Sequence, residues 1–340
     1  MLKTAVVILN WNGIGFLKKF LQNVIYNSSL PGTKVFVADN GSTDGSAEWV
    51  ESNCKQAALI KLDKNHGFAG GYNLALEQVS AEYYVLLNSD VEVAPGWLEP
   101  LVRHLDDHRD IAACQPKILS YDKKEYFEYA GAAGGYIDKY GYPFCRGRIF
   151  DFVEKDTGQY NDSVNVFWAS GACMIVRSKA WNECGGFDAD FFAHMEEIDL
   201  CWRFHAAGFR LAYVPSSAVC HVGGGALPYD SPFKTYLNFR NSLFLLYKNL
   251  EDEEMKSILF ARRVLDGIAA LKFLLTGSVG SFRAVWKAHR DYYRSIPVLR
   301  EKRQAVKNMR KGDYSAPILN KSIVFEFYAK GNKTFDSLKF

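Results

Sequence analysis

The chain has 340 residues, of which 48% are hydrophobic and 23% charged, and its formal net charge is +3. These values are close to those of soluble globular proteins and exclude a disordered or fibrous chain. No run of about 18 apolar residues free of charges, Pro and Gly occurs, so we expect no membrane-spanning helix. Seven cysteines without paired spacings or a CxxC motif indicate free thiols in a reducing compartment, which favours the cytoplasm.

The first 90 residues alternate apolar strands with helices. The apolar run 5–9 is too short, and too soon followed by polar residues, to be a signal peptide, and we interpret it as a buried first strand. Apolar residues at helical spacing follow at 16–25, and further strands are predicted at 34–39, 58–62 and 82–87. This alternation predicts an α/β fold with a mostly parallel, doubly wound sheet whose ligands gather at the carboxyl ends of the strands.

Polar side chains follow three of these strands where each strand ends. They are Asn10 and Asn12 after the first strand, Asp39, Asn40 and Ser42 after the second, and Asn88 and Asp90 after the fourth. We expect the three clusters to meet in one crevice. Asp39 stands where dinucleotide-binding folds place an acid that binds a nucleoside, but the GxGxxG turn of those folds is absent, which disfavours a nicotinamide or flavin dehydrogenase. Asp44 is interpreted as a helix N-terminal acid.

Seven segments, taken in order, resemble family 2 glycosyltransferases with the GT-A fold. They are VVILNWN, VADNGSTDGS, NHGFAGGYN, LLNSDVEV, WASGACMIVR, FFAHMEEIDLCWR and CHVGG, and they lie within residues 6–224. Their order makes chance a poor explanation, and the resemblance is strongest to bacterial rhamnosyltransferase-like members. It implies a Rossmann-like, mostly parallel sheet flanked by helices, and a metal-dependent, inverting transfer of a sugar from a nucleotide diphosphate to an acceptor hydroxyl.

The resemblance implies a site for Mn²⁺ or Mg²⁺, which would neutralise the charge of the leaving nucleoside diphosphate. Asp90 matches the last acid of the family's DxD metal motif. Asn88 stands where many members have the first Asp, so the site carries less charge. The H-x-x-G pattern implies that His221 is a second ligand, and its imidazole suits Mn²⁺ better than Mg²⁺. The alternative for His221 is a buried, satisfied histidine at a strand end.

Three acids compete as the base that takes the acceptor proton: Glu196, Glu197 and Asp199. The family's E-D-x-D-L segment has its base at the second position, which matches Glu197. Here Glu replaces the usual Asp and moves the carboxylate outward by one methylene. Asp199 and Arg203 are four residues apart on an expected helix, so we favour an ion pair for Asp199. Glu196 is interpreted as a helix cap or a substrate-orienting residue.

Two segments rich in small residues are expected to line the nucleotide sugar, together with the strand-end residues Asn10, Asn12, Asp39, Asn40, Ser42 and Asn88. The first holds Gly67, Phe68, Gly70, Gly71 and Asn73, and the second holds Trp168, Gly171 and Ala172. The first lacks the Lys-Ser/Thr ending of a P-loop and is interpreted as a donor-binding loop, in which glycines allow close backbone approach. The indole of the second would pack near a sugar ring. For the first segment, the alternative is a tight strand-to-helix turn. For Trp168 of the second, it is packing of the indole in the protein core.

The last third of the chain is strongly basic. Residues 256–311 hold 14 Lys and Arg against 3 Asp and Glu, a local charge of +11. Apolar residues recur there at helical spacing, namely Tyr236, Phe239, Leu243, Leu246 and Leu250, then Ile258, Leu259, Leu265, Ile268 and Leu271, then Phe282, Val285, Trp286, Tyr292 and Tyr293. Such helices are typical of binding to an anionic leaflet, and equally of packing with a solvated basic face. No nucleic-acid-binding module accompanies the charge, so we expect no nucleic acid partner.

We therefore predict a GT-A glycosyltransferase domain at 1–230, a basic amphipathic helical extension at 231–311 and a tail of uncertain structure at 312–340, which adds a strand or wraps the domain. The expected donor is a dTDP- or UDP-sugar, with dTDP-rhamnose ahead. The expected acceptor is a hydroxyl of a glycan or polyprenol-linked glycan in cell-surface polysaccharide synthesis, at the cytoplasmic face of the inner membrane. The alternatives are a non-catalytic sugar-nucleotide-binding scaffold of a glycan-assembly complex, and a nucleotidyltransferase, whose basic glycine-rich loop after the first strand is missing.

Overall fold

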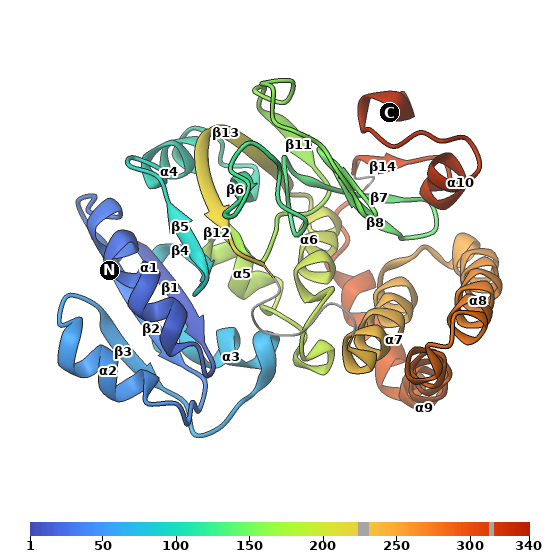
Figure 1. Ribbon diagram of the computed structural model, residues 1–340, viewed down its shortest axis with the longest axis horizontal. Helices are drawn as coiled ribbons and strands as arrows, with labels where there is room; N and C mark the ends of the chain where they lie inside the picture. Colours follow the sequence, from blue (N-terminus) through green and yellow to red (C-terminus); the bar gives the residue numbers. More distant parts are fainter. Residues whose placement is uncertain (224–230, 313–315) are drawn as a thin grey trace.

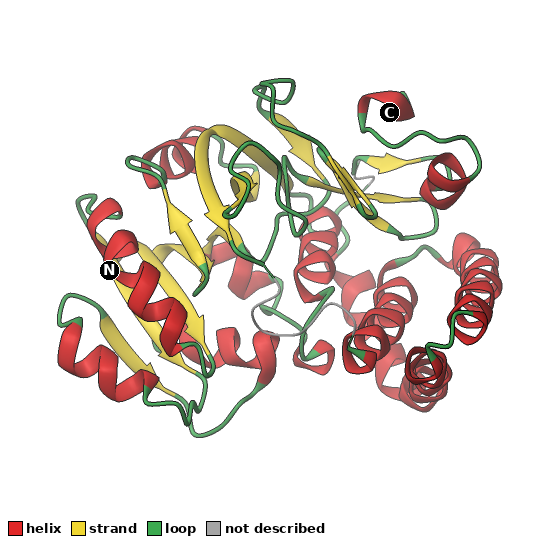
Figure 2. Ribbon diagram, in the orientation of Figure 1, coloured by secondary structure: helices red, strands yellow, loops and turns green. Residues whose placement is uncertain are grey.

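The computed structural model describes residues 1–223, 231–312 and 316–340 (Figure 1). A central sheet with flanking helices forms one end of the molecule, and a group of long helices forms the other end. A smaller second sheet lies between them along one side, close to the C-terminus (Figure 2).

The first half of the central sheet is parallel, as predicted. Its strands run in the order β4-β1-β2-β3, and all three neighbouring pairs are parallel. The strands are β1 (Leu2–Asn10), β2 (Thr33–Asp39), β3 (Ala58–Lys61) and β4 (Ala81–Asn88), and the helices between them are α1 (Ile14–Asn27), α2 (Ser46–Asn53) and α3 (Gly67–Leu76). The carboxyl ends of β4, β1 and β2 are therefore adjacent.

The second half of this sheet is mixed, which the sequence pattern did not predict. Its elements are β5 (Val91–Val93), α4 (Leu98–Asp107), β6 (Ile111–Ser120), β11 (Val164–Val166), β12 (Cys173–Arg177), α5 (Ser178–Glu183), the 3-10 helix η1 (Ala189–Phe191), α6 (Glu196–Ala206) and β13 (Arg210–His221). β12 is antiparallel to both β4 and β6, whereas β13 is parallel to β6. Between β6 and β12 the chain passes through the second sheet, so no crossover helix directs β12 into a parallel register.

The second sheet joins the middle of the chain to its tail. Its strands are β7 (Gly135–Asp138), β8 (Pro143–Cys145), β9 (Arg148–Ile149), β10 (Phe152–Val153) and β14 (Ile318–Leu319), and the tail adds α10 (Ile323–Tyr328) and the 3-10 helix η2 (Asp336–Leu338). β14 pairs with β7, and the rings of Phe335 and Phe340 lie 5.0 and 4.9 Å from that of Tyr136. The tail therefore adds a short strand at 318–319 and also wraps the second sheet, while its apolar run at 323–328 forms α10.

Three long helices complete the chain: α7 (Pro232–Asn249), α8 (Asp252–Leu275) and α9 (Val279–Met309). The predicted apolar face of α7 is buried, with Leu243 and Leu246 fully enclosed. None of the helices in the described part of the chain combines the length and hydrophobicity needed to cross a bilayer. The expected domain boundary at residue 230 lies outside the described residues, and the three-part division of the chain remains a prediction.

Side chains of the central sheet point alternately into two hydrophobic cores. Val6 and Ile8 of β1 pack on one side with Leu17 of α1, and Val7 packs on the other side with Tyr72 of α3. Both faces of β1 are therefore buried, which is why its sequence reads as one continuous apolar run.

Candidate active site

The strand-end residues meet as predicted. Asn10 lies opposite Asp39 in the β1–β2 register, and its neighbour Leu9 lies opposite Asn88 in the β1–β4 register. Asn10 Nδ2 donates to Asp39 Oδ1 at 3.3 Å and to Ser42 Oγ at 3.2 Å, while Ser42 N donates to Asp39 Oδ2 at 3.0 Å. The chain after β2 is thereby fixed against the end of β1.

Asn12 and Asp44 hold the loops on either side of this cluster. Asn12 Oδ1 accepts from Thr43 N at 2.7 Å, and its own backbone N–H donates to Ser42 Oγ at 2.9 Å. Asp44 accepts from the backbone of Ile14 at 2.9 Å and of Ser46 at 3.1 Å, which are the first residues of α1 and α2. The interpretation of Asp44 as a helix N-terminal acid is confirmed.

The glycine-rich segment is not a loop, because α3 begins at Gly67. Its glycines serve close packing: a Cβ on Gly67 would lie 2.5 Å from the Phe192 ring, and one on Gly71 would lie 2.9 Å from Asn40 Nδ2. Gly70 is similarly close to the side chain of His66. The predicted donor-binding loop is therefore wrong as a local structure, although its start adjoins Asn40, whose Nδ2 donates to Gly67 O at 2.9 Å.

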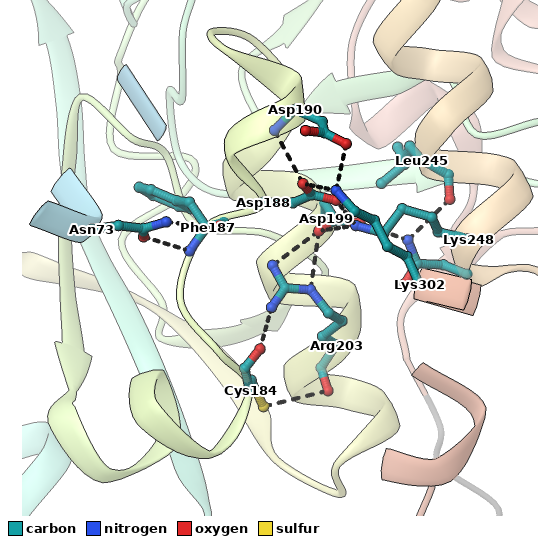
Figure 3. Close-up of polar contacts among 11 residues, drawn as sticks. Asn73, Cys184, Phe187, Asp188, Asp190, Asp199, Arg203, Leu245, Lys248 and Lys302 are labelled. Carbon is teal, nitrogen blue, oxygen red and sulfur yellow. Dashed lines mark hydrogen bonds and ion pairs between the residues drawn. The ribbon is translucent and has the colours of Figure 1, made fainter. Parts of the chain in front are cut away.

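Two residues predicted to bind the nucleotide sugar have structural contacts instead. Asn73 exchanges hydrogen bonds of 2.8 and 3.0 Å with the backbone of Phe187 (Figure 3). Trp168 is 3% exposed, and its Nε1 donates to Tyr136 O at 2.9 Å, so its ring belongs to the core. The alternative of core packing is correct for this indole, which has no face open to a sugar.

Gly171 and Ala172 connect the two chemically important parts of the site. The Cβ position of Gly171 is 3.2 Å from the Phe68 ring and 4.0 Å from Glu197 Cβ. Ala172 O accepts from Asn88 N at 3.0 Å. Because Gly171 and Ala172 are small, Glu197 and the end of β4 are separated only by this dipeptide.

The predicted metal ligands Asp90 and His221 are in contact. His221 Nε2 lies 3.1 Å from Asp90 Oδ1 and 3.3 Å from Asn88 Nδ2, because β13 pairs with β5, the short strand that follows Asp90, and places His221 opposite Val91. Asp90 also accepts from Gly223 N at 3.2 Å. Burial alone would raise the pKa of Asp90, but the interaction with His221 lowers it below its usual range. Gly224, the last residue of the H-x-x-G pattern, lies outside the described residues.

Glu128 is a site residue that the sequence reasoning missed. Its Oε2 lies 3.2 Å from His221 Nδ1, on the other side of the ring from Asp90, and accepts from Ala130 N at 2.6 Å. Burial lowers the pKa of His221, but the two carboxylates outweigh it and raise this pKa to about 10. The only signal in the sequence was one acid in the otherwise small and apolar stretch 127–134.

The Asp90 and His221 pair fits a divalent cation once His221 has lost its proton, because only a neutral imidazole binds a metal and the pKa of about 10 describes the site without a cation. A carboxylate oxygen and an imidazole nitrogen converge at 3.1 Å, and this mixture of ligands suits Mn²⁺. No third His, Cys, Asp or Glu completes a metal-binding group among the residues that the structure describes. The protein would therefore supply two ligands and leave other coordination positions to a diphosphate and water.

Glu196 and Glu197 begin α6 but differ in their surroundings. Glu197 as a residue is partly exposed, but its Oε2 atom is buried and accepts no hydrogen bond from any described residue. Desolvation, partly offset by backbone N–H groups at the helix start, raises its pKa to about 7. Glu196 is 4% exposed, and desolvation together with the charge of Glu197 raises its pKa well above the usual range. The environment therefore favours the neutral form of Glu196, whereas Glu197, with a pKa of about 7, can accept a proton near neutral pH.

Asp199 belongs to a buried ionic network (Figure 3). It is fully buried and accepts from Arg203 Nε at 3.0 Å, as the predicted ion pair requires, and also from Lys248 Nζ and Asn249 Nδ2 at 2.9 Å. Burial would raise the pKa of Asp199, but Lys248 and Arg203 lower it. Its oxygens are committed to these partners, which removes Asp199 from the candidate catalytic residues.

The backbone before α6 is strained and is held by α7. Phe192, His194 and Met195 have φ values of 66°, 70° and 73°. Asn241 Nδ2 donates to the carbonyl oxygens of Phe191 and Ala193 at 2.9 Å and of His194 at 2.7 Å. A backbone strained in this way is retained only where surrounding contacts hold it in place, as the hydrogen bonds from Asn241 do. No motif pointed to Asn241, because its partners are main-chain atoms far away in sequence.

Comparison with known proteins identifies the family of the chain. The model of the family "Glycosyl transferase family 2" matches residues 5–185. The N-acetylglucosaminyl-diphospho-decaprenol L-rhamnosyltransferase of Mycobacterium tuberculosis is 26% identical over 230 residues, which cover 64% of this chain and 75% of the relative. The rhamnosyltransferase WbbL of Escherichia coli is 26% identical over 225 residues, which cover 64% of this chain and 82% of the relative.

The fold has solved counterparts. The mannosyltransferase PcManGT from Pyrobaculum calidifontis, solved in complex with GDP-Man and Mn²⁺, superposes with a TM-score of 0.52 at 16% identity. The match covers 90% of this chain and 85% of that one, so the likeness extends through the C-terminal helices. Taken with the family model, it shows that the chain belongs to glycosyltransferase family 2 and has the GT-A fold.

Proposed function

We propose that this glycosyltransferase moves a sugar, with inversion, from a nucleotide-diphosphate sugar to a hydroxyl of a glycan or polyprenol-linked glycan in cell-surface polysaccharide synthesis. One observation carries the proposal: Glu197, with a pKa of about 7, is joined through Gly171 and Ala172 to the end of β4 that holds Asp90 and His221. The proposed base and the proposed metal ligands thus lie on either side of the Gly171–Ala172 dipeptide. This arrangement suits attack of an acceptor hydroxyl on an anomeric carbon that carries a diphosphate.

Glu197 acts as the general base in this proposal. Its carboxylate takes the proton of the acceptor hydroxyl while the acceptor oxygen bonds to the anomeric carbon and the bond from that carbon to the diphosphate oxygen breaks. Attack from the face opposite the leaving group inverts the configuration. Asp90 and His221 would hold Mn²⁺ or Mg²⁺, which when bound neutralises charge on the leaving diphosphate. The strand-end cluster of Asn10 and Asp39 would bind the nucleoside.

The leading donor is dTDP-rhamnose, with a UDP-sugar as the alternative. Support comes from the two bacterial relatives, both of which are named as rhamnosyltransferases. One of these names also includes a decaprenol-linked sugar, which supports a polyprenol-linked acceptor. All seven cysteines are free thiols, in keeping with work on the cytoplasmic side of the inner membrane.

A donor panel tests the proposal. The purified chain is incubated with dTDP-rhamnose, UDP-sugars or GDP-mannose and Mn²⁺ or Mg²⁺, and thermal stability and nucleoside-diphosphate release are followed with and without EDTA. We expect one donor to stabilise the protein in a metal-dependent way and to be slowly hydrolysed. Asp90→Ala should lose both effects, and Asp122→Asn, which changes an exposed acid, should keep them. If no donor has an effect and Asp90→Ala behaves like wild type, the scaffold alternative replaces the enzyme.

A further inference from the structure

Helix α8 has two apolar faces, and only one of them is packed. Ile258 and Leu259 of the predicted amphipathic face point inward and are buried, together with Arg262. The opposite face carries Phe260, Val264, Ile268, Leu271 and Leu275, which are between 49% and 79% exposed. Their spacings of three and four residues place them in one stripe about 22 Å long. Ile268 and Leu271, expected to share a face with Ile258 and Leu259, therefore lie on the outer side.

Helix α9 continues this exposed surface. Trp286 is 65% exposed, and Val279 and Tyr293 lie seven residues to either side of it, on the same face. The exposed Arg263 of α8 donates to Tyr293 Oη at 3.2 Å, so the outer faces of the two helices adjoin. Both helices lie at the edge of the molecule, on the side away from the central sheet (Figure 1).

Unpaired basic side chains flank the exposed stripe. No carboxylate of the described residues lies within ion-pair distance of Lys256, Arg263, Lys272, Arg283, Lys287 or Arg294, and all six are exposed. Other basic residues of this region are used internally, since Arg303 binds Asp252 and Lys302 binds Asp188 and Asp190. Many of the 14 basic residues at 256–311 are therefore paired internally, and the six named above are most of those that pair with no described carboxylate, the others being Arg300 and Lys311.

The two helices are also polarised along their length. Arg303 pairs with Asp252 and His289 with Asp266, so α8 and α9 run antiparallel. The exposed acids Glu253, Glu254 and Glu301 consequently lie at one end of the pair. The other end, where α8 meets α9, carries Leu274, Leu275, Val279 and the basic residues Lys272 and Arg283, and no acid among residues 267–290.

We propose that the outer face of α8 and α9 docks on an anionic lipid leaflet, with the α8–α9 junction entering the headgroup region. Exposed aliphatic and Trp side chains bury their apolar surface there, while Lys and Arg approach the lipid phosphates. A second copy of the chain is a poorer occupant, because pairing this face with itself would bring like charges together. The proposal extends the proposed function, whose polyprenol-linked acceptor lies in a membrane, but binding itself needs no donor.

Vesicle flotation of the full chain tests the proposal. Vesicles of phosphatidylcholine alone are compared with vesicles that also contain phosphatidylglycerol, at low and high salt. We expect binding to the anionic vesicles only, weakened by salt. The triple variant Ile268→Ser, Leu271→Ser, Leu275→Ser and the double variant Arg283→Glu, Lys287→Glu should each lower the affinity at least about tenfold. Tyr26→Ser with Tyr328→Ser, and Lys18→Glu with Lys55→Glu, change exposed residues elsewhere and should bind like wild type.

A fluorescence measurement gives a second readout. The emission of wild type should shift to shorter wavelength on anionic vesicles, and Trp286→Phe should lose most of that shift. Absence of binding by wild type, or equal binding by all variants, would overturn the proposal. A wild-type dimer that the triple serine variant converts to monomer without change in vesicle binding would instead assign the face to a second copy.

The failure of this proposal and that of the proposed function are distinguishable. Vesicle binding by a chain that neither binds nor hydrolyses any donor leaves the docking surface intact and removes the enzyme. Metal-dependent donor hydrolysis by a chain that does not bind anionic vesicles would support the enzyme and remove the docking surface.

Discussion

Asn241 of helix α7 donates a hydrogen bond of 2.7 Å to the carbonyl oxygen of His194, two residues before Glu196. The same amide nitrogen also binds the carbonyl oxygens of Phe191 and Ala193. A helix outside the family-matched region thus fixes the backbone from which the proposed base projects. In the proposed mechanism, helix α7 is therefore part of the catalytic architecture.

Asn241→Ala should lower turnover more than donor affinity. It leaves buried carbonyl oxygens unpaired beside a strained backbone, so we expect a stability loss of about 1–3 kcal/mol and a misplaced Glu197. Chemical denaturation and steady-state kinetics measure the two effects. Asn238→Ala, on the same helix, removes an amide that makes no hydrogen bond with any described residue, and it should be nearly neutral. Unchanged kcat in Asn241→Ala would contradict the positioning role.

Glu197→Gln should lower the transfer rate by about 10²- to 10⁴-fold, because the amide cannot take the acceptor proton. Donor binding, followed by thermal shift, should persist because the shape of the site is kept. Glu183→Gln changes an exposed acid at the end of α5 and serves as the matched control. Full transfer by Glu197→Gln would exclude this residue as the base.

The pH dependence of wild type should follow the pKa of Glu197, which is about 7. A base works only when unprotonated, so kcat should rise with pH through this value and then level off. Because the same pKa is raised above its unfolded value, ionisation of Glu197 should lower stability as pH increases from about 4.5 to about 7. In Glu197→Gln this contribution disappears. If the stability of Glu197→Gln varied with pH in the same way as that of wild type, the raised pKa of Glu197 would be contradicted.

Replacement of the proposed metal ligands should remove the effect of the metal on thermal stability, while the protein still folds. Asp90→Asn and His221→Ala should each lose the Mn²⁺-dependent thermal shift with nucleoside diphosphate, as wild type should in EDTA. In Asp90→Asn the imidazole keeps Glu128, 3.2 Å away, as a charged partner. Retention of the Mn²⁺ effect in both variants would place the cation elsewhere.

Lys248→Met should be strongly destabilising. Lys248 binds Asp188 at 2.6 Å and Asp199 at 2.9 Å, and all three are buried or nearly so (Figure 3). Loss of the ammonium group leaves buried carboxylates uncompensated, at a cost of about 3–5 kcal/mol. Lys18→Met, at an exposed position on α1, should change the free energy of unfolding little. Equal stability of both variants would show that the network is dispensable.

Local patterns predicted the parallel half of the sheet and the meeting of Asn10, Asp39 and Asn88, because strand periodicity and strand-end polarity are written in consecutive residues. The resemblance to the family likewise pointed to Asp90, His221 and Glu197 as candidate site residues. The same patterns failed for the glycine-rich segment: the glycines at 67–71 permit both a loop and a tightly packed helix, and only their contacts with Phe192 and Asn40 show which is formed.

By itself, the sequence determined the family, the order of the first strands and the residue types available for chemistry, since these depend on short-range pattern. The tertiary structure decided which side chains are committed to partners. It placed Trp168 in the core, paired Asp199 with Lys248, and brought Glu128 to His221 and Asn241 to His194. These outcomes depend on contacts between residues that are far apart in the chain, and the spacing of neighbouring residues does not encode such contacts. The same contacts set each pKa, through desolvation and nearby charges.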